Sequence, residues 1–166
     1  MQHPECLAPI LTFLTRVGIT VRMQAVPDDS FLPGVTVIGG ALAVETTKLK
    51  WPGDLLHEAG HIAVLPSALR HRANEDLFNQ SDVEFAGELE AMAWAYAAIV
   101  DIGLPIEVLI HDGGYNGRPQ ALVQMYSFRV YPGLAGLCKA GMTAAPGFTE
   151  NCGPIHYPRM LRWLRA

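Results

Sequence analysis

The sequence contains few cysteines, little charge and no long apolar run, and each shortage excludes a class of protein. Its three cysteines are odd in number and show no Cys-x-x-Cys spacing, which argues against a disulfide framework and a cysteine-based zinc site. No uninterrupted apolar stretch approaches the roughly 20 residues of a membrane-spanning helix, so we expect no transmembrane segment. Charged residues make up only 17% of the chain, against roughly 25% in an average soluble domain.

The charge that is present favours neither nucleic acid nor an anionic membrane. The net charge is −4 at pH 7, so there is no general attraction to polyanions, and we expect no nucleic-acid partner. The first residues carry Glu5 and lack a basic region, unlike a secretory signal. Together with free thiols, which are typical of reducing compartments, this predicts a cytoplasmic protein. The 166 residues, half of them hydrophobic, are expected to form a single domain.

The periodicity of the N-terminal half predicts a helix followed by strands. Apolar residues recur at three and four positions over residues 4–17, which indicates a helix. Residues 19–26 alternate between apolar and polar, which is typical of a half-buried strand. Two short β-prone runs flank Gly39 and Gly40. These glycines favour a hairpin there, because both accept the positive φ angles of a tight turn.

Two longer helices and a helical C-terminal part are expected to follow. Asp54 is a suitable N-cap for a helix that ends near Pro66, and Ser81 or Asp82 can cap a second one that continues to about Asp101. Shorter helices are predicted over residues 106–111, 119–128, 134–140 and 158–165. These elements predict an α+β fold with an N-terminal helix, a small antiparallel or mixed sheet, two packed helices and a helical C-terminal part.

The first of the two longer helices carries the motif His57-Glu58-Ala59-Gly60-His61, which is HExxH. Histidines at i and i+4 project from one face of a helix, close enough to bind one metal ion. Imidazole suits zinc, and a catalytic zinc site has three protein ligands. The glutamate between the histidines can act as a general base for hydrolysis. Random placement of the chain's six His and nine Glu produces this motif in about one sequence in a hundred.

The surroundings of the motif favour a metal site. The flanking residues are apolar, so we expect this helix to be buried. Two histidines and a glutamate on a buried helix need partners, because burying polar groups without them is costly. A metal ion would satisfy them. The alternative is a pair of core histidines that hydrogen-bond to the backbone.

A third ligand must come from elsewhere, because no histidine follows at the spacing HExxHxxGxxH. The second long helix offers Glu84, Glu88 and Glu90. At 100° per residue, Glu88 lies about 70° from the centre of the apolar face of that helix, Glu84 about 110° and Glu90 about 130°. Glu88 is therefore the favoured ligand, with Glu90 and Glu84 as alternatives. At least one of the three is expected on a solvated acidic face.

An HExxH helix followed by a helix with a glutamate resembles the gluzincin metallopeptidases, over roughly residues 19–100. The order of the expected elements is similar to that of their minimal members, the integral-membrane CAAX-type endopeptidases and the small cytosolic peptidases that cleave phage and stress repressors. This resemblance implies a zincin-like fold and a zinc-dependent metallopeptidase that acts on a peptide or protein substrate. It implies that His57, His61 and Glu88 hold Zn²⁺ and that Glu58 is the general base.

The chain departs from the family pattern at one position. The glutamate segment Glu88-Leu89-Glu90-Ala91-Met92 has a methionine where the family places an acid or amide four residues after its ligand. That residue normally orients a ligand histidine. The departure favours an alternative hypothesis, a non-catalytic zinc-binding protein that regulates or binds a partner. A metal-dependent hydrolase that acts on a non-peptide bond is a third hypothesis.

The resemblance also implies a substrate strand and an electrophile for the oxyanion. Such enzymes bind an extended peptide along an edge strand, and residues 41–45 are the matching segment, although an ordinary hairpin strand is equally compatible with the sequence. The electrophile is usually a Tyr or His from the C-terminal part. Five residues are candidates: His111, Tyr115, Tyr126, His156 and Tyr157. The apolar, glycine-rich residues 130–147 are where we expect a partner surface or a homo-oligomer contact.

Overall fold

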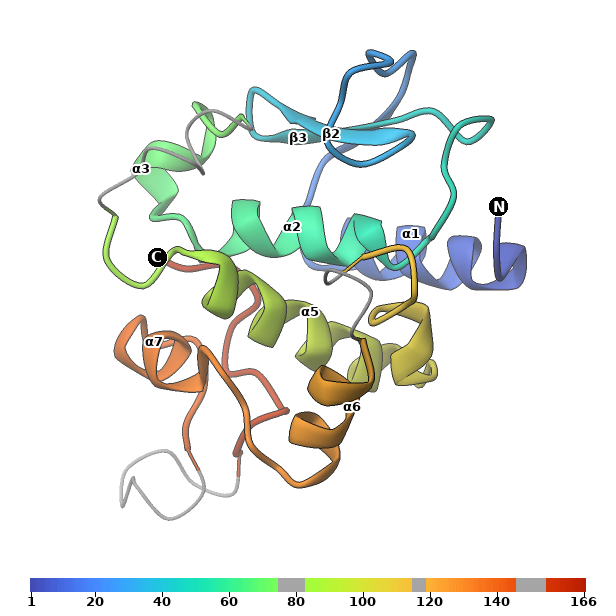
Figure 1. Cartoon of the computed structure of the whole chain (residues 1–166). Helices are drawn as coiled ribbons and strands as arrows, with labels where there is room; N and C mark the ends of the chain where they lie inside the picture. The colour runs from blue at the N-terminus through green and yellow to red at the C-terminus, as the bar shows by residue number, and fades with distance from the viewer. Residues whose placement is uncertain (75–82, 115–118, 146–154) are drawn as a thin grey trace.

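The computed structural model describes residues 1–74, 83–114, 119–145 and 155–166. These residues form an α+β fold with six α-helices and a mixed sheet of three strands. Figure 1 shows the sheet on one side of helix α2 (Asp54–Val64) and helix α5 (Glu88–Ile102) on the other side. The two helices therefore lie at the centre of the molecule, as expected for the motif helix and the glutamate helix.

The N-terminal segment forms a short 3₁₀ helix, η1 (Pro4–Cys6), and then α1 (Leu7–Arg16). Helix α1 buries Ile10, Phe13 and Leu14 in the core. The strand that the alternation predicted over residues 19–26 is shorter in the structure, since β1 covers only Val21–Met23. Its length is limited by its partner, because these three residues are the ones that pair with β3.

The predicted hairpin is present as β2 (Val35–Ile38) and β3 (Ala41–Val44), and both turn glycines have positive φ. Strand β3 pairs with β2 antiparallel and with β1 parallel, so the strand order is β1-β3-β2. The expectation that residues 41–45 form an edge strand for substrate is therefore wrong. Those residues fill the centre of the sheet, and their backbone groups are taken up by pairing on both sides.

Helices α2 and α5 pack tightly where a glycine faces a helix backbone. A Cβ atom on Gly60 would lie 2.5 Å from the carbonyl oxygen of Ala91, so no larger residue fits without moving α5. Every residue of α2 except His57 is buried. Although α5 is strongly apolar, the described residues contain no helix with the length and hydropathy of a membrane span.

The starts of both helices differ from the sequence prediction. The N-cap of α2 is Gly53, and Asp54 is its first helical residue, with a side chain turned to a partner elsewhere in the fold. Helix α5 begins at Glu88 rather than at residue 81 or 82, which lie outside the described residues. The Gly87 amide donates a hydrogen bond to the Glu90 carboxylate at 3.2 Å, which fixes this start.

The C-terminal part contains α3 (Ser67–Arg70) after α2, and then η2 (Ile106–Val108), α6 (Pro119–Ser127) and α7 (Leu134–Lys139). The helix predicted over residues 158–165 is absent, since this segment is irregular. Tertiary contacts hold it instead: the Trp94 indole donates to the Trp163 carbonyl at 2.8 Å, and the Arg165 amide donates to the Ala63 carbonyl at 3.0 Å.

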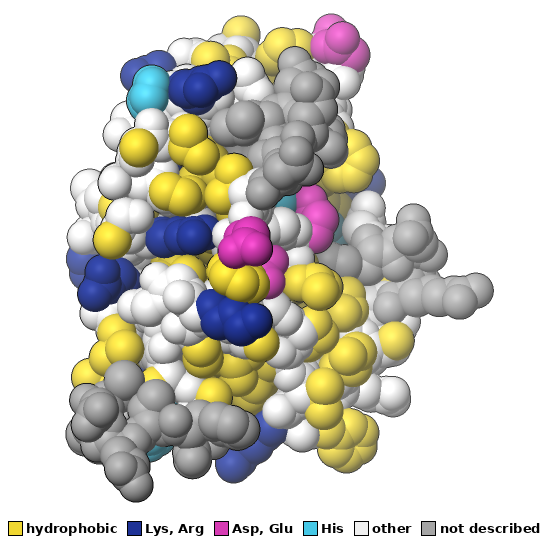
Figure 2. Space-filling model, turned by 90° about the vertical axis from the view of Figure 1, so that its left-hand side faces the viewer, with side chains coloured by type: hydrophobic (Ala, Val, Ile, Leu, Met, Phe, Trp, Pro, Cys, Tyr) yellow, Lys and Arg dark blue, Asp and Glu magenta, His cyan; other side chains and the backbone are white. Residues whose placement is uncertain are grey.

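The apolar segment that was expected to form a partner surface packs largely within the fold. Leu137, Met142 and Ala144 are buried, while Val130 is exposed. Residues 146 and 147 lie outside the described part of the chain. Figure 2 shows that hydrophobic side chains also cover much of one outer face, with acidic side chains gathered near its middle. The large core and the partly apolar surface together account for the small share of charged residues in the chain.

Candidate metal centre

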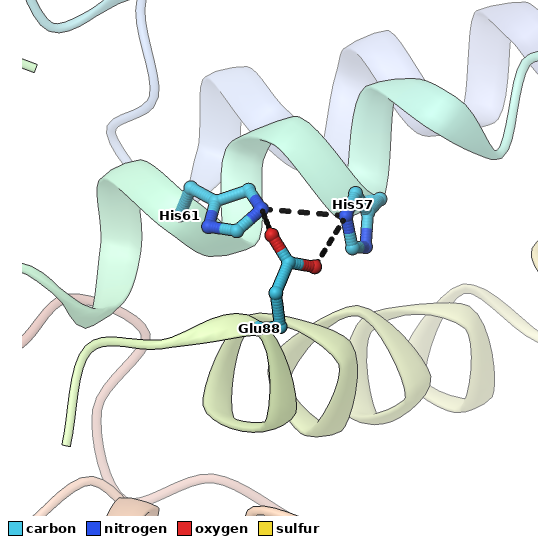
Figure 3. A group of neighbouring side chains, drawn as sticks. All are labelled: His57, His61 and Glu88. Carbon is cyan, nitrogen blue, oxygen red and sulfur yellow. Dashed lines mark hydrogen bonds and ion pairs between the residues drawn. The ribbon is translucent and has the colours of Figure 1, made fainter. Parts of the chain in front are cut away.

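The two histidines of the motif lie one turn apart on the face of α2 that meets the start of α5 (Figure 3). The Nε2 atoms of His57 and His61 are 3.3 Å apart, and the two rings stand nearly perpendicular, at 88°. The side chain of His61 is 5% exposed and that of His57 is 16% exposed. Both rings therefore present the same nitrogen to a common point while the rest of each ring is buried.

Glu88 supplies a carboxylate to the same point from the first residue of α5. One of its oxygens lies 3.4 Å from Nε2 of His57, and the other lies 3.2 Å from Nε2 of His61. One donor atom from each of the three residues can be chosen so that all lie within 4.8 Å of one another. The close packing at Gly60 brings Glu88 into this position, because it draws the first turn of α5 against α2.

The other two glutamates considered as ligands point elsewhere. The carboxylate of Glu90 accepts the Gly87 amide and lies against Gly136 of α7. Glu84 is exposed, and its carbonyl oxygen accepts a hydrogen bond from Arg165. Of the three candidates from the sequence, the structure brings Glu88 to the histidines.

The donor set fits a divalent metal ion such as zinc. Ligand bonds of about 2.0–2.1 Å at tetrahedral angles place neighbouring donor atoms about 3.3 Å apart. The two Nε2 atoms are 3.3 Å apart, and each lies 3.4 or 3.2 Å from a different oxygen of the Glu88 carboxylate. Two imidazole nitrogens and a carboxylate are also a donor combination found in catalytic zinc sites. The residues present are therefore suited to hold such an ion without rearranging the two helices.

Electrostatics in the cluster favour a positive charge. Burial disfavours the charged form of His57, but the hydrogen bond to Glu88 and the charges of Glu58, Glu88 and Asp54 outweigh it, so its pKa is raised. Hydrogen bonds from His57 and His61 hold the pKa of Glu88 well below its usual range, although its side chain is 72% exposed.

Glu58, the expected general base, is buried next to the histidines. It follows His57 directly on α2, and its charge contributes to the raised pKa of His57. Its position is therefore compatible with the general-base role that the motif implies.

An open pocket of about 460 Å³ adjoins the cluster. Residues from four parts of the chain line it: Phe31, Leu32, Pro33, Asp54, His57, Glu88, His111, Gly113 and Gly114. The segment ahead of β2 forms an apolar wall, and polar side chains form the other side. The cluster is thus reached through a pocket with an apolar wall facing polar groups, which is the usual composition of a small-ligand or substrate site.

The pocket contains a buried pair that the sequence analysis did not foresee, Asp54 and His111. The Nε2 atom of His111 lies 2.9 Å from Oδ1 of Asp54, and each residue is 6% exposed. The Gly113 amide donates to Nδ1 of His111 at 3.2 Å, and the His111 ring stacks on Trp51 with 4.2 Å between ring centroids. One signal was available: Asp54 stands three residues before His57, hence on the same helical face.

Of the five candidate electrophiles, the described residues place only His111 in this pocket. Both of its ring nitrogens are already engaged, by Asp54 and by Gly113. Burial raises the pKa of Tyr126, which lies in the core. The Tyr157 hydroxyl donates to the Ala93 carbonyl at 2.9 Å. His156 is half-buried and does not line this pocket, and Tyr115 lies outside the described residues.

Comparisons with known proteins return no relative: no protein-family model, no curated protein and no solved structure matches the chain. The likeness to the gluzincins therefore depends on the motif, the glutamate helix and the geometry of the cluster.

Proposed function

We propose that the protein is a zinc-dependent metallopeptidase with a minimal, zincin-like fold of the gluzincin kind. The observation that carries the proposal is the convergence of His57, His61 and Glu88, whose donor atoms lie close enough together to share one metal ion. These residues come from two helices that pack in contact, and the site opens into a pocket. Together these features support a metal held at a point that substrate can reach.

In the proposed reaction, the chain's own residues hold the metal and move the proton. His57, His61 and Glu88 would hold Zn²⁺, which when bound polarises a carbonyl group and makes water more acidic. The Glu58 carboxylate would accept a proton from the attacking water and then give it to the amine that leaves when the peptide bond breaks. Its burial beside the histidines keeps this carboxylate out of bulk solvent.

The same structure suggests where an extended peptide would bind. Strand β2 is an edge strand: among the described residues it pairs with β3, and beyond that pairing it makes two isolated bridges, from Val35 to Leu32 and from Ile38 to Asn74. Phe31, Leu32 and Pro33, just ahead of β2, form the apolar wall of the pocket. We propose that substrate adds to β2 in place of the central strand considered from the sequence.

A second function is favoured by two observations. Position 92 is a buried methionine rather than an acid, and neither ring nitrogen of His111 is available to bind an oxyanion. Both suit a non-catalytic protein that keeps zinc in order to bind or regulate a partner. Metal binding is common to the two functions, and only hydrolysis separates them.

Metal analysis of the purified protein beside a His57→Ala variant tests the site itself. The wild type should contain about one equivalent of zinc per chain, and the variant should lose it, because one of three protein ligands is gone. His71→Ala is the matched control, since His71 is exposed and stands outside the cluster. Equal zinc in the wild type and in His57→Ala would contradict the proposal.

The affinity for zinc should fall as the pH is lowered. A metal must displace the proton from His57, and the Glu88 contact and nearby carboxylates raise the pKa of that residue above 6.5. Below this raised pKa, the affinity should therefore weaken by about tenfold per pH unit for each proton released. A chelator-competition titration between pH 8.5 and pH 5.5 measures the effect, and an affinity that stays constant across this range would be inconsistent with it.

A further inference from the structure

The ring of His57 has a second nitrogen without a partner. A histidine that binds a metal almost always donates its other ring N–H to a carboxylate, a carbonyl or water, which fixes the ring and strengthens it as a ligand. In this chain, Nδ1 of His57 is buried and has no hydrogen-bond partner among the described residues. The thioether of Met92 is only a weak acceptor. The site as proposed therefore needs an acceptor for His57 from another source.

Asp54 offers a carboxylate oxygen of this kind. It lies three residues before His57 on α2, on the same helical face, and both residues line the same pocket. Its Oδ2 atom is buried and, like Nδ1 of His57, has no hydrogen-bond partner among the described residues. Figure 3 shows the second nitrogen of His57 on the side of its ring away from His61, and Asp54 is the first residue of the same helix.

His111 binds Oδ1 of Asp54 and so leaves the other carboxylate oxygen, Oδ2, without a hydrogen-bond partner. Because the Gly113 amide donates to Nδ1 of His111, the hydrogen of this ring is on Nε2 and is donated to Oδ1 of Asp54, at 2.9 Å. Stacking on Trp51, with only 7° between the ring planes, limits rotation of His111. The negative charge of Asp54 also contributes to the raised pKa of His57, as expected of a close neighbour.

We propose that Asp54 is the positioning residue for His57: with metal bound, its Oδ2 would accept the Nδ1–H of His57, while His111 anchors its Oδ1. This chain of three residues would hold the ligand histidine in one tautomer, with Nε2 free for the metal. Asp54 thereby replaces the acid that the chain lacks at position 92, from the motif helix itself rather than from α5. The inference rests on the proposed metal site.

The variant Asp54→Asn tests this assignment. Its carbonyl oxygen can still accept from His111, so its amide nitrogen would face Nδ1–H of His57, donor against donor. We expect zinc affinity, measured by chelator competition, to fall about 10- to 100-fold, and the absorption spectrum of the cobalt-substituted protein to change. Asp101→Asn, which removes the same charge from an exposed ion pair with Arg16, should match the wild type in both measurements.

Two results would overturn the proposal. One is an Asp54→Asn variant that binds zinc as tightly as the wild type and gives the same cobalt spectrum. The other needs no variant: imidazole NMR of the zinc-bound wild type should show His57 protonated at Nδ1, with a low-field, slowly exchanging proton. Its absence contradicts the hydrogen bond even if Asp54→Asn fails to fold. A wild type that binds no zinc would instead refute the proposed function.

Discussion

Replacing Glu58 with glutamine should leave the metal in place and lower the rate of peptide hydrolysis by roughly 10²- to 10⁴-fold, the usual contribution of a general base. Glutamine preserves the size and hydrogen-bonding reach of the side chain but does not accept a proton at neutral pH. His57, His61 and Glu88 are unchanged, so zinc content and affinity should stay close to those of the wild type. The loss should appear in kcat with little change in KM.

The measurement uses casein and a pool of unstructured peptides, with products identified by mass spectrometry. Glu84→Gln is the matched control, because Glu84 is an exposed glutamate outside the cluster and was an alternative ligand from the sequence. It should cleave at the wild-type rate. Undiminished cleavage by Glu58→Gln would refute the mechanism. A wild type that holds zinc and cleaves none of these substrates would favour the regulatory function over the enzyme.

The parts of the site that could be predicted from the sequence depend on local geometry. The positions of His57 and His61 on one face follow from their spacing of four residues in a helix. Glu88 could be preferred over Glu84 and Glu90 because its angle to the apolar face is set by the same helical period. The hairpin was predictable for a similar reason, since two glycines at a turn determine a local conformation that the structure shows.

The parts that could not be predicted depend on contacts between distant segments. Asp54 and His111 are 57 positions apart, and no local pattern indicates that they pair. The central place of β3 results from a parallel partner, β1, that precedes the hairpin in the chain. The last residues contain a helical pattern of apolar side chains. Their contacts with Trp94 and Ala63 determine their conformation instead.

The start of α5 shows a third kind of limit. Ser81 and Asp82 have side chains suited to capping, whereas the residue that caps the helix, Gly87, has none. A capping box usually has two hydrogen bonds, one accepted by the N-cap side chain and one donated by the N-cap amide to a glutamate three residues later. Here only the second is present, from the Gly87 amide to Glu90. This later start makes Glu88 the first residue of the helix. A carboxylate there is also stabilised by the positive end of the helix dipole.

Replacing His111 should lower the free energy of unfolding, although His111 is not one of the proposed metal ligands. His111→Ala deletes the hydrogen-bond donor to Oδ1 of Asp54 and leaves this buried carboxylate without its partner. Breaking a buried ion pair or charged hydrogen bond from one side typically costs about 3–5 kcal/mol. The free energy of unfolding, measured with guanidinium in the presence of a chelator, should therefore fall by roughly this amount. His71→Ala should change it by less than about 0.5 kcal/mol.

The double variant Asp54→Ala/His111→Ala distinguishes the buried charge from lost packing. If the cost of His111→Ala comes mainly from an unpaired carboxylate, removing that carboxylate as well should restore part of the stability, despite the larger cavity. If stacking on Trp51 and burial of the ring are the main contributions, the double variant should be less stable than the single one. The latter result would mean that His111 acts chiefly as a packing residue, and that Asp54 can be charged and buried beside His57 without it.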